Sequence, residues 1–146
     1  MELDDVDRRI LDVLRRDGRA SMNEVAARVS VSRANAYARV KRMQDDGVIL
    51  GFSVRTDPVL EGLHASAYVA LSVEQASWQD LRARLSTIPE VSHVALVGGD
   101  FDVLLLVRAR DNRDLRRIVL GDLQSIPSVR STRTFLVFED VQPALE

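Results

Sequence analysis

Apolar residues at helical spacing mark three short amphipathic segments in the first third of the chain. Residues 3–16 repeat an apolar side chain every three or four positions, and Gly18 follows as a helix stop. Ser21 and Glu24 have the spacing of a capping box, which predicts that a second helix begins there. Ser32 predicts the cap of a third helix. Because each segment has one apolar face, the three should pack around a common core.

Charge is segregated on the third segment. Ala36, Val40 and Met43 fall on one face of a helix that we expect to end near Asp46, and the other side chains turn outward. Residues 25–44 contain five basic residues and no acidic one. A short helix packed across another, with small residues and cations on its outer face, suits the major groove of duplex DNA. A solvated basic helix in a small bundle is the structural alternative.

Eight residues of this helix pair are candidate DNA contacts. The phosphate candidates are Arg28, Ser32, Arg39 and Arg42. The base-edge candidates are Arg33, Asn35, Tyr37 and Lys41. An Asn can bridge adenine N6 and N7, and an Arg can bridge guanine O6 and N7. For Arg39, an ion pair with an acidic residue of the first helix is the alternative role.

A turn signal at Asp46-Gly47 separates the helices from a different pattern. Residues 48–56 are predicted to form a strand, which pairs either with a returning segment or with a partner chain. Asp57-Pro58 ends this strand, because proline has no amide hydrogen for a ladder and restricts the residue before it. The predicted divisions are a helix-turn-helix domain at 1–54, a linker at 55–63 and a second domain at 64–146.

Beyond residue 64 the pattern alternates between strand and helix. The expected elements are a strand at 65–73, a helix opening at Ser77 and reaching 88, strands at 91–97 and 101–109, a helix at 112–125 and a strand at 129–141. An internal repeat supports this order, since Leu85-Ser-Thr-Ile-Pro-Glu-Val91 matches Leu123-Gln-Ser-Ile-Pro-Ser-Val129. The predicted fold class is therefore α+β, with a ferredoxin-like βαββαβ sandwich that carries both helices on one face of an antiparallel sheet.

The second face of that sheet should also be covered. Residues 65–73 alternate without a strongly polar register, and residues 103–107 are wholly apolar. An apolar face of this kind is most simply buried against another subunit.

Composition and charge narrow the possible functions. Residues 1–55 carry 11 Lys or Arg against 9 Asp or Glu, a net of +2, whereas residues 56–146 carry 9 against 13, a net of −4. Only the first part suits a polyanion, and its low net charge requires a second copy or a concentrated basic face. The absence of cysteine and the isolation of His64 and His93 predict no metal site, no cofactor and no catalytic residue. An acidic N-terminus and the lack of a long apolar run predict a cytoplasmic protein without membrane contact.

The stretch Gly98-Gly99-Asp100-Phe101-Asp102 can be read in two ways. Gly-Gly-Asp is a good hairpin turn on physical grounds alone. The glycines also expose backbone amides to a carboxylate, while a neighbouring Asp can meet an ammonium group, and an α-amino acid offers both charges. In the second interpretation Asp102 neutralises the amino group of the ligand.

Four motifs along the chain resemble those of one known family. They are Leu3-Asp4-x-x-Asp7-x-x-Ile10-Leu11, Asp17-Gly18-Arg19, Arg39-Val40-Lys41-Arg42-Met43 followed by Gly47-Val48-Ile49, and Gly99-Asp100-Phe101-Asp102. In this combination and order, the chain resembles the Lrp/AsnC (feast/famine) transcription regulators over nearly its whole length. The start of the third helix, residues 32–37, lacks the proline that many relatives carry, so the resemblance does not extend to the DNA sequence recognised.

The resemblance implies an N-terminal winged-helix-type DNA reader and a C-terminal effector domain of the βαββαβ kind. Members of the family form homodimers through the second domain, often assemble into tetramers or octamers, and commonly bind an amino acid between subunits. The effector pocket of the family would be lined here by residues 98–102 and by the stretch Thr132-Arg133-Thr134 of the last strand, in which Thr132 and Thr134 are the candidate contacts.

We therefore expect a sequence-specific DNA-binding transcriptional regulator that responds to a small effector, an amino acid by resemblance. The alternative is an architectural protein that compacts DNA without an effector and uses its second domain only to oligomerise. An enzyme is a third class, against which stand the missing cysteines, the isolated histidines and the lack of a glycine-rich phosphate loop.

Overall fold

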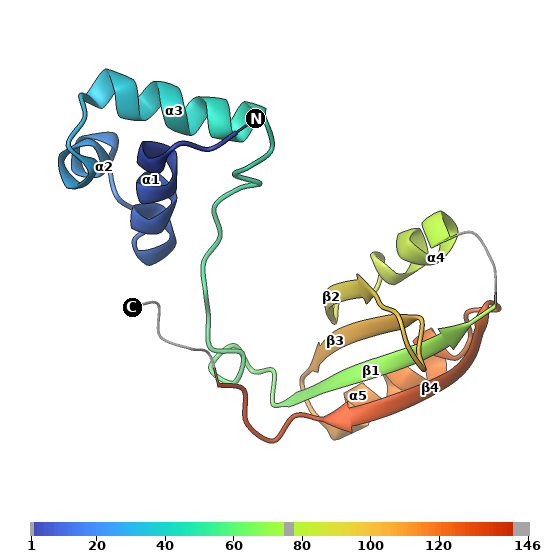
Figure 1. The fold of residues 1–146 in the computed structure, drawn as a ribbon. Coiled ribbons are helices and arrows are strands. Elements are labelled where there is room, and N and C mark those ends of the chain that lie inside the picture. The colour runs from blue at the N-terminus through green and yellow to red at the C-terminus, as the bar shows by residue number, and fades with distance from the viewer. Residues whose placement is uncertain (1, 75–77, 142–146) are drawn as a thin grey trace. The chain divides into compact units, whose positions relative to one another are not determined.

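The computed structural model describes residues 2–74 and 78–141, which form two compact units (Figure 1). The first unit ends at Arg55 and the second comprises Thr56–Val141. Each unit has its own cluster of buried apolar side chains. Among the described residues, no helix is long and apolar enough to span a bilayer.

The first unit contains the three expected helices, and each begins at a side-chain cap. Their bounds are α1 Asp5–Arg16, α2 Met22–Val29 and α3 Arg33–Asp45. Asp4 and Asp7 form a capping box at α1, and Ser21 and Glu24 form one at α2. The Ser32 hydroxyl accepts the N3 amide of α3 at 3.1 Å. The caps fix where the helices begin, and the turn between α2 and α3 is completed by a left-handed residue at position 30.

The core of this unit lies where the three helices cross. Its largest fully buried side chains are Ile10, Val25, Val29 and Met43. Ala36 is also fully buried, which lets the backbone of α3 lie close to the other helices. The helical pattern in the sequence thus predicted the buried face of α3 correctly.

The strand expected at residues 48–56 is not present. These residues have no ladder partner in the described chain, and their alternate apolar side chains are exposed: Leu50 is 94%, Phe52 53% and Val54 85% accessible. A strand requires a neighbour for its amide and carbonyl groups, and no segment among residues 2–74 and 78–141 returns beside it. The prediction of a strand paired inside the chain is therefore wrong.

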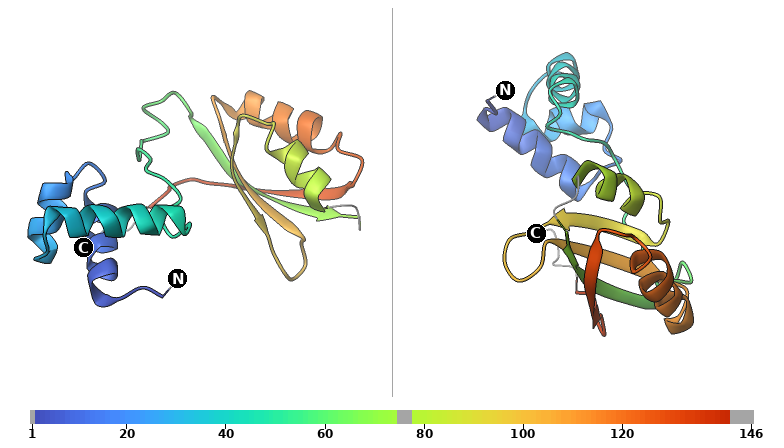
Figure 2. Two further views of the ribbon diagram at one scale, coloured as in Figure 1. Left: turned by 90° about the horizontal axis from the view of Figure 1, so that it is seen from above. Right: turned by 90° about the vertical axis from the view of Figure 1, so that its right-hand side faces the viewer.

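The second unit is a four-stranded antiparallel sheet with helices on one face (Figure 2). Its elements are β1 Ala65–Val73, α4 Trp78–Leu85, β2 Val91–Leu96, β3 Val103–Ala109, α5 Asn112–Arg117 with a π-helical continuation at Ile118–Leu123, and β4 Val129–Leu136. The strand order is β2-β3-β1-β4, as expected for a βαββαβ sandwich. The expected helix start at Ser77 lies outside the described residues.

Several boundaries differ from the expectation: α1 begins at Asp5 rather than at residue 3, α4 ends at Leu85 rather than at residue 88, and β2 ends at Leu96 rather than at residue 97. β3 begins at Val103 rather than Phe101, because Asp102 ends the preceding loop by bonding back to β1. The last strand ends at Leu136 rather than at residue 141: the Val137 amide still donates to Ser66 O at 2.9 Å, and Phe138 beyond it is 97% exposed. The last helix leaves α geometry at Ile118 and continues as a π-helix. Each of these ends depends on strand pairing or tertiary packing, which the periodicity of the sequence does not reveal.

The two faces of the sheet are covered differently. Alternate residues of β1 and β3 are buried beneath α4 and α5, and they include Val69, Leu71 and Leu105. On the opposite face Tyr68 is 42% exposed, and its directly paired neighbour Leu106 is only half-buried. We call this the open face, and its large apolar residues are Tyr68, Leu104, Leu106 and Phe135.

Candidate nucleic-acid interface and effector loop

The side chains of α3 lie in rows along the helix. Ala36, Val40 and Met43 form the buried row. Turning by about 100° per residue places Arg33, Tyr37 and Lys41 on one flank and Asn35, Arg39 and Arg42 on the other. Ala34 and Ala38 are exposed on the ridge between the flanks. The predicted base-edge residues therefore share one flank, except Asn35, which lies among the predicted phosphate contacts.

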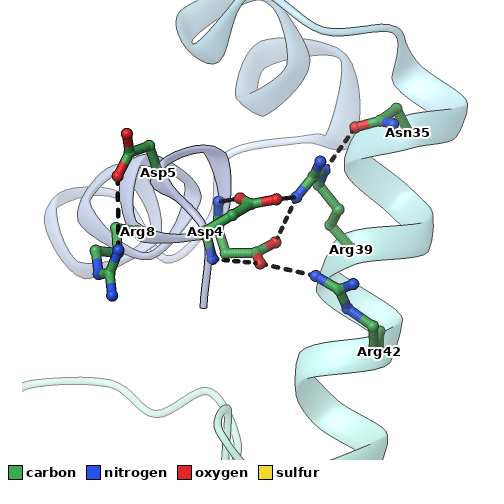
Figure 3. Close-up of polar contacts among 7 residues, drawn as sticks. Asp4, Asp5, Arg8, Asn35, Arg39 and Arg42 are labelled. Atoms are coloured by element: carbon green, nitrogen blue, oxygen red, sulfur yellow. Dashed lines mark hydrogen bonds and ion pairs between the residues drawn. The ribbon is translucent and has the colours of Figure 1, made fainter. Parts of the chain in front are cut away.

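The flank with Asn35 is joined to the start of α1 by ion pairs (Figure 3). One amino group of Arg39, Nη1, donates to Asp4 Oδ2 at 2.6 Å and to Asp7 Oδ1 at 2.8 Å. Arg42 Nη2 donates to Asp7 Oδ2 at 2.7 Å. Arg39 Nε donates to Asn35 Oδ1 at 2.8 Å. We call these five residues, Asp4, Asp7, Asn35, Arg39 and Arg42, the α1–α3 cluster.

Asp7 is the centre of the cluster. Its side chain is fully buried, and its two oxygens accept from both arginines and from the backbone amide of Asp4. A buried carboxylate is tolerated only when it is paired and hydrogen-bonded in this way. The ion pair proposed as the alternative role of Arg39 is present. The sequence motif contained both acids, but only their tertiary placement shows that they anchor α3.

Asp4 makes the cluster sensitive to acid. The hydrogen bond from Arg39 and the bond from the backbone amide of Asp7 lower the pKa of the Asp4 carboxyl from its ordinary 3.8 to about 2. A pKa that is lower in the folded state adds stability that is complete above the unfolded value and is lost as the pH falls toward the folded value.

We expect Asp4→Asn, which can still cap α1 but carries no charge, to be less stable than the wild type near neutral pH. The difference in melting temperature should shrink as the pH falls from about 5 to about 2, where wild-type Asp4 becomes protonated. Thermal unfolding at several pH values would measure this. A difference that stayed constant across the range would show that the Asp4 charge does not contribute.

The other side chains predicted to contact DNA differ in whether they are already paired with an acidic residue. Lys41 pairs with Asp45 at 2.8 Å, and Arg28 of α2 pairs with Asp17 at 3.2 Å. Both pairs are solvent-exposed, and exposed pairs are weak enough to exchange for a phosphate. Within the described part of the chain Arg33 has no acidic partner, and the Tyr37 side chain is 58% exposed.

The predicted effector residues lie at one end of the sheet. The loop after β2 reverses at Gly99, whose φ of +123° favours glycine. Asp102 fastens the loop to β1, because its amide donates to Leu71 O at 3.0 Å and its carboxylate accepts from the Val73 amide at 2.9 Å. In the described part of the chain the second Asp102 oxygen accepts no hydrogen bond, and Asp100 is exposed.

Side chains from both faces of β4 lie near this end of the sheet. Thr132 and Thr134 pair with buried residues of β1 and so belong to the helix-covered face, where Thr132 Oγ1 accepts from Gln124. Arg133 points to the open face, with its guanidinium carbon 5.2 Å from the centre of the Phe101 ring. Sequence analysis placed Arg133 in the stretch expected to line the pocket but assigned no role to its side chain. The available signal was the alternation of the strand, which turns Arg133 to the face opposite that of its neighbours Thr132 and Thr134.

Each of the two units matches a known protein family. Residues 3–49 match a winged helix-turn-helix DNA-binding family, and residues 66–144 match the Lrp/AsnC ligand binding domain. The chain is 36% identical to the HTH-type transcriptional regulator AldR of Mycolicibacterium smegmatis, over 98% of this chain and 85% of that protein.

Two solved structures are similar over almost the entire chain. A transcriptional regulator of Neisseria meningitidis in complex with L-Met has a TM-score of 0.89 at 26% identity, covering 97% of this chain and 94% of that one. The leucine response regulatory protein LrpA of Mycobacterium tuberculosis has a TM-score of 0.86 at 32% identity, covering 97% and 96%. From the capped helix-turn-helix, the βαββαβ unit and these relatives, we conclude that the chain belongs to the Lrp/AsnC family of DNA-binding transcriptional regulators, with a ligand-binding domain and no enzymatic role.

Proposed function

We propose that the protein reads specific DNA sequences as a dimer or larger assembly whose geometry responds to an amino acid. The observation that supports DNA reading most directly is the outer surface of α3. Its ridge consists of Ala34 and Ala38, which add no bulk beyond Cβ and so let the helix approach the floor of the major groove. Polar side chains on both flanks then reach base edges or phosphates.

The two flanks have different tasks in this proposal. Arg33, Tyr37 and Lys41 contact base edges from the flank that faces away from α1. Arg42, with support from Ser32 and Arg28, contacts phosphates. Arg39 contributes charge to the same surface while its 22% exposed side chain remains tied to α1. The α1–α3 cluster therefore holds the reading helix at a fixed angle, which base recognition requires.

Replacing Arg33 by alanine should weaken binding to the preferred duplex by about tenfold or more, because a specific Arg contact to a base is removed. Binding to unrelated duplex should change much less. Arg116→Ala is the matched control, since it removes an exposed arginine from α5 in the other unit. Gel-shift titrations on a duplex selected from a random pool would measure both. Equal losses for both variants would contradict the assignment of Arg33.

A dimer is supported by the open face. A single chain exposes apolar side chains there that the sequence alternation places opposite the core, and a second copy would cover them. Exposed Leu50, Phe52 and Val54 also alternate along a stretch that pairs with no strand among the described residues, which suits pairing with a partner chain. A single first unit carries a low net positive charge and should bind DNA weakly. Two such units linked in a dimer would bind more tightly, because both can contact the same duplex.

An amino-acid effector is supported by the loop at residues 98–102. It offers exposed backbone amides at two glycines and two carboxylates within three residues, groups that complement the two charges of an α-amino acid. The similar Neisseria regulator was solved with L-Met. An effector alters DNA binding only if its affinity differs between two states of the assembly.

Thermal shift against the common amino acids should identify at least one that stabilises the protein. Asp102→Asn should weaken that ligand by at least about tenfold, because a charge-assisted contact to the amino group is lost while Asn can still accept from the Val73 amide. Asp80→Asn, on the outer side of α4, is the control. If no amino acid raises the melting temperature, the architectural alternative is favoured instead.

A further inference from the structure

One contact of the α1–α3 cluster bears on which bases α3 can recognise. Arg39 Nε donates to the side chain of Asn35 at 2.8 Å. The guanidinium has donors only, so the atom of Asn35 that faces it must be the amide oxygen. The oxygen and nitrogen of an Asn amide have nearly the same shape, so shape alone does not distinguish them. Here the donor on Arg39 determines that the Asn35 oxygen points toward it.

Arg39 is itself held firmly. Its Nη1 bonds both Asp4 and Asp7, and Asp7 is fully buried. Figure 3 shows the resulting chain of contacts from the start of α1 through Arg39 to Asn35. Rotating the amide of Asn35 would break its bond to a guanidinium that has little freedom to follow.

The other end of the amide is free to bind. Asn35 is exposed, and in the described part of the chain its Nδ2 group has no acceptor. Asn35 therefore presents two N–H donors outward and directs its oxygen toward Arg39. An unrestrained Asn can bridge adenine, giving a hydrogen bond to N7 and accepting one from N6. This restrained Asn lacks a free acceptor in the required direction.

We propose that Asn35, oriented by Arg39, selects a keto base over an amino base in the major groove. Guanine presents O6 and N7 and thymine presents O4, all acceptors for the Nδ2 donors. Cytosine presents an amino group, and adenine presents one beside its N7 acceptor, so with either base an amino group would face the second Nδ2 hydrogen. The inference rests on the proposed DNA-reading function and adds the chemical class of one recognised base.

Selection from a randomised duplex pool, followed by sequencing, tests the proposal with three variants of the full chain. Wild type should enrich guanine or thymine at one strand position. Asn35→Asp keeps an oxygen for Arg39 but replaces the donors by an acceptor, so the preference should move to adenine or cytosine by about fivefold or more. Arg39→Lys keeps a cation for Asp4 and Asp7 but has no donor at the Nε position, so adenine should become acceptable there.

Arg8→Lys is the matched control, because it makes the same substitution in the first unit outside the α1–α3 cluster, where Arg8 pairs with the exposed Asp5, and it should leave the base preference unchanged. The inference is overturned if Asn35→Asp and Arg39→Lys retain the wild-type preference at every position. It is also overturned if Asn35→Asp changes the preference and Arg39→Lys does not, since Arg39 would then not orient the amide. A wild type that enriches no sequence contradicts the proposed function instead.

Discussion

Replacing Asp7 by alanine should lower the free energy of unfolding of the first unit by about 3 kcal/mol. The buried carboxylate of Asp7 pairs with Arg39 at 2.8 Å and with Arg42 at 2.7 Å. Its removal leaves a cavity, takes this partner from Arg42 and leaves Arg39 with Asp4 as its acidic partner. It also removes half of the capping box at α1. This is the largest stability effect that we expect from a single substitution in the unit.

Hydrogen exchange of the α1 and α3 amides would measure this effect in the full chain, because it reports on the first unit separately. Asp5→Ala is the control, since the Asp5 side chain is 97% exposed and pairs with Arg8 at only 3.5 Å. The control should change the free energy by less than about 0.5 kcal/mol. If Asp7→Ala behaved like Asp5→Ala, the two arginines would be sufficiently hydrated without their partner.

Leu106→Arg should convert the assembly to single chains and weaken DNA binding by about 100-fold or more. Leu106 lies on the open face opposite Tyr68, so an arginine there would place an unpaired charge at the centre of the proposed interface. Loss of the second reader removes the advantage of binding two sites at once. The fold of the chain should persist, because the side chain lies outside the helix-covered core.

Analytical ultracentrifugation and gel shifts would report the two consequences together. Leu120→Arg is the control, because Leu120 is 50% exposed in the π-helical segment of the helix layer. It introduces the same charge without touching the open face. A Leu106→Arg protein that still sedimented as a dimer would place the subunit interface elsewhere.

Local signals in the sequence were sufficient for the helices and the order of elements. The pairs Ser21 with Glu24 and Ser32 with the Asn35 amide act within one turn, so spacing alone identifies the starts of α2 and α3. The repeat around Pro89 and Pro127 marks two places where a helix gives way to a strand. These features are encoded by neighbours in the chain.

Features that depend on distant partners could not be predicted in the same way. The alternation at residues 50–54 resembles a strand, but a strand exists only beside another one. Arg39 was assigned to DNA or to an acid of α1 with no local basis for choosing, because Asp4 is 35 positions away. Thr132 and Arg133 face opposite sides because side chains alternate along a strand, but which of them faces the helices follows from the register of β4 against β1.

Asp4 has two roles that involve different helices. Its carboxylate accepts the Asp7 amide and so begins α1, and the same carboxylate accepts from Arg39 in the middle of α3. Helix ends ordinarily fray independently of the rest of a domain. Here, opening the first turn of α1 would also release Arg39, so terminal fraying and loosening of the reading helix become one cooperative event.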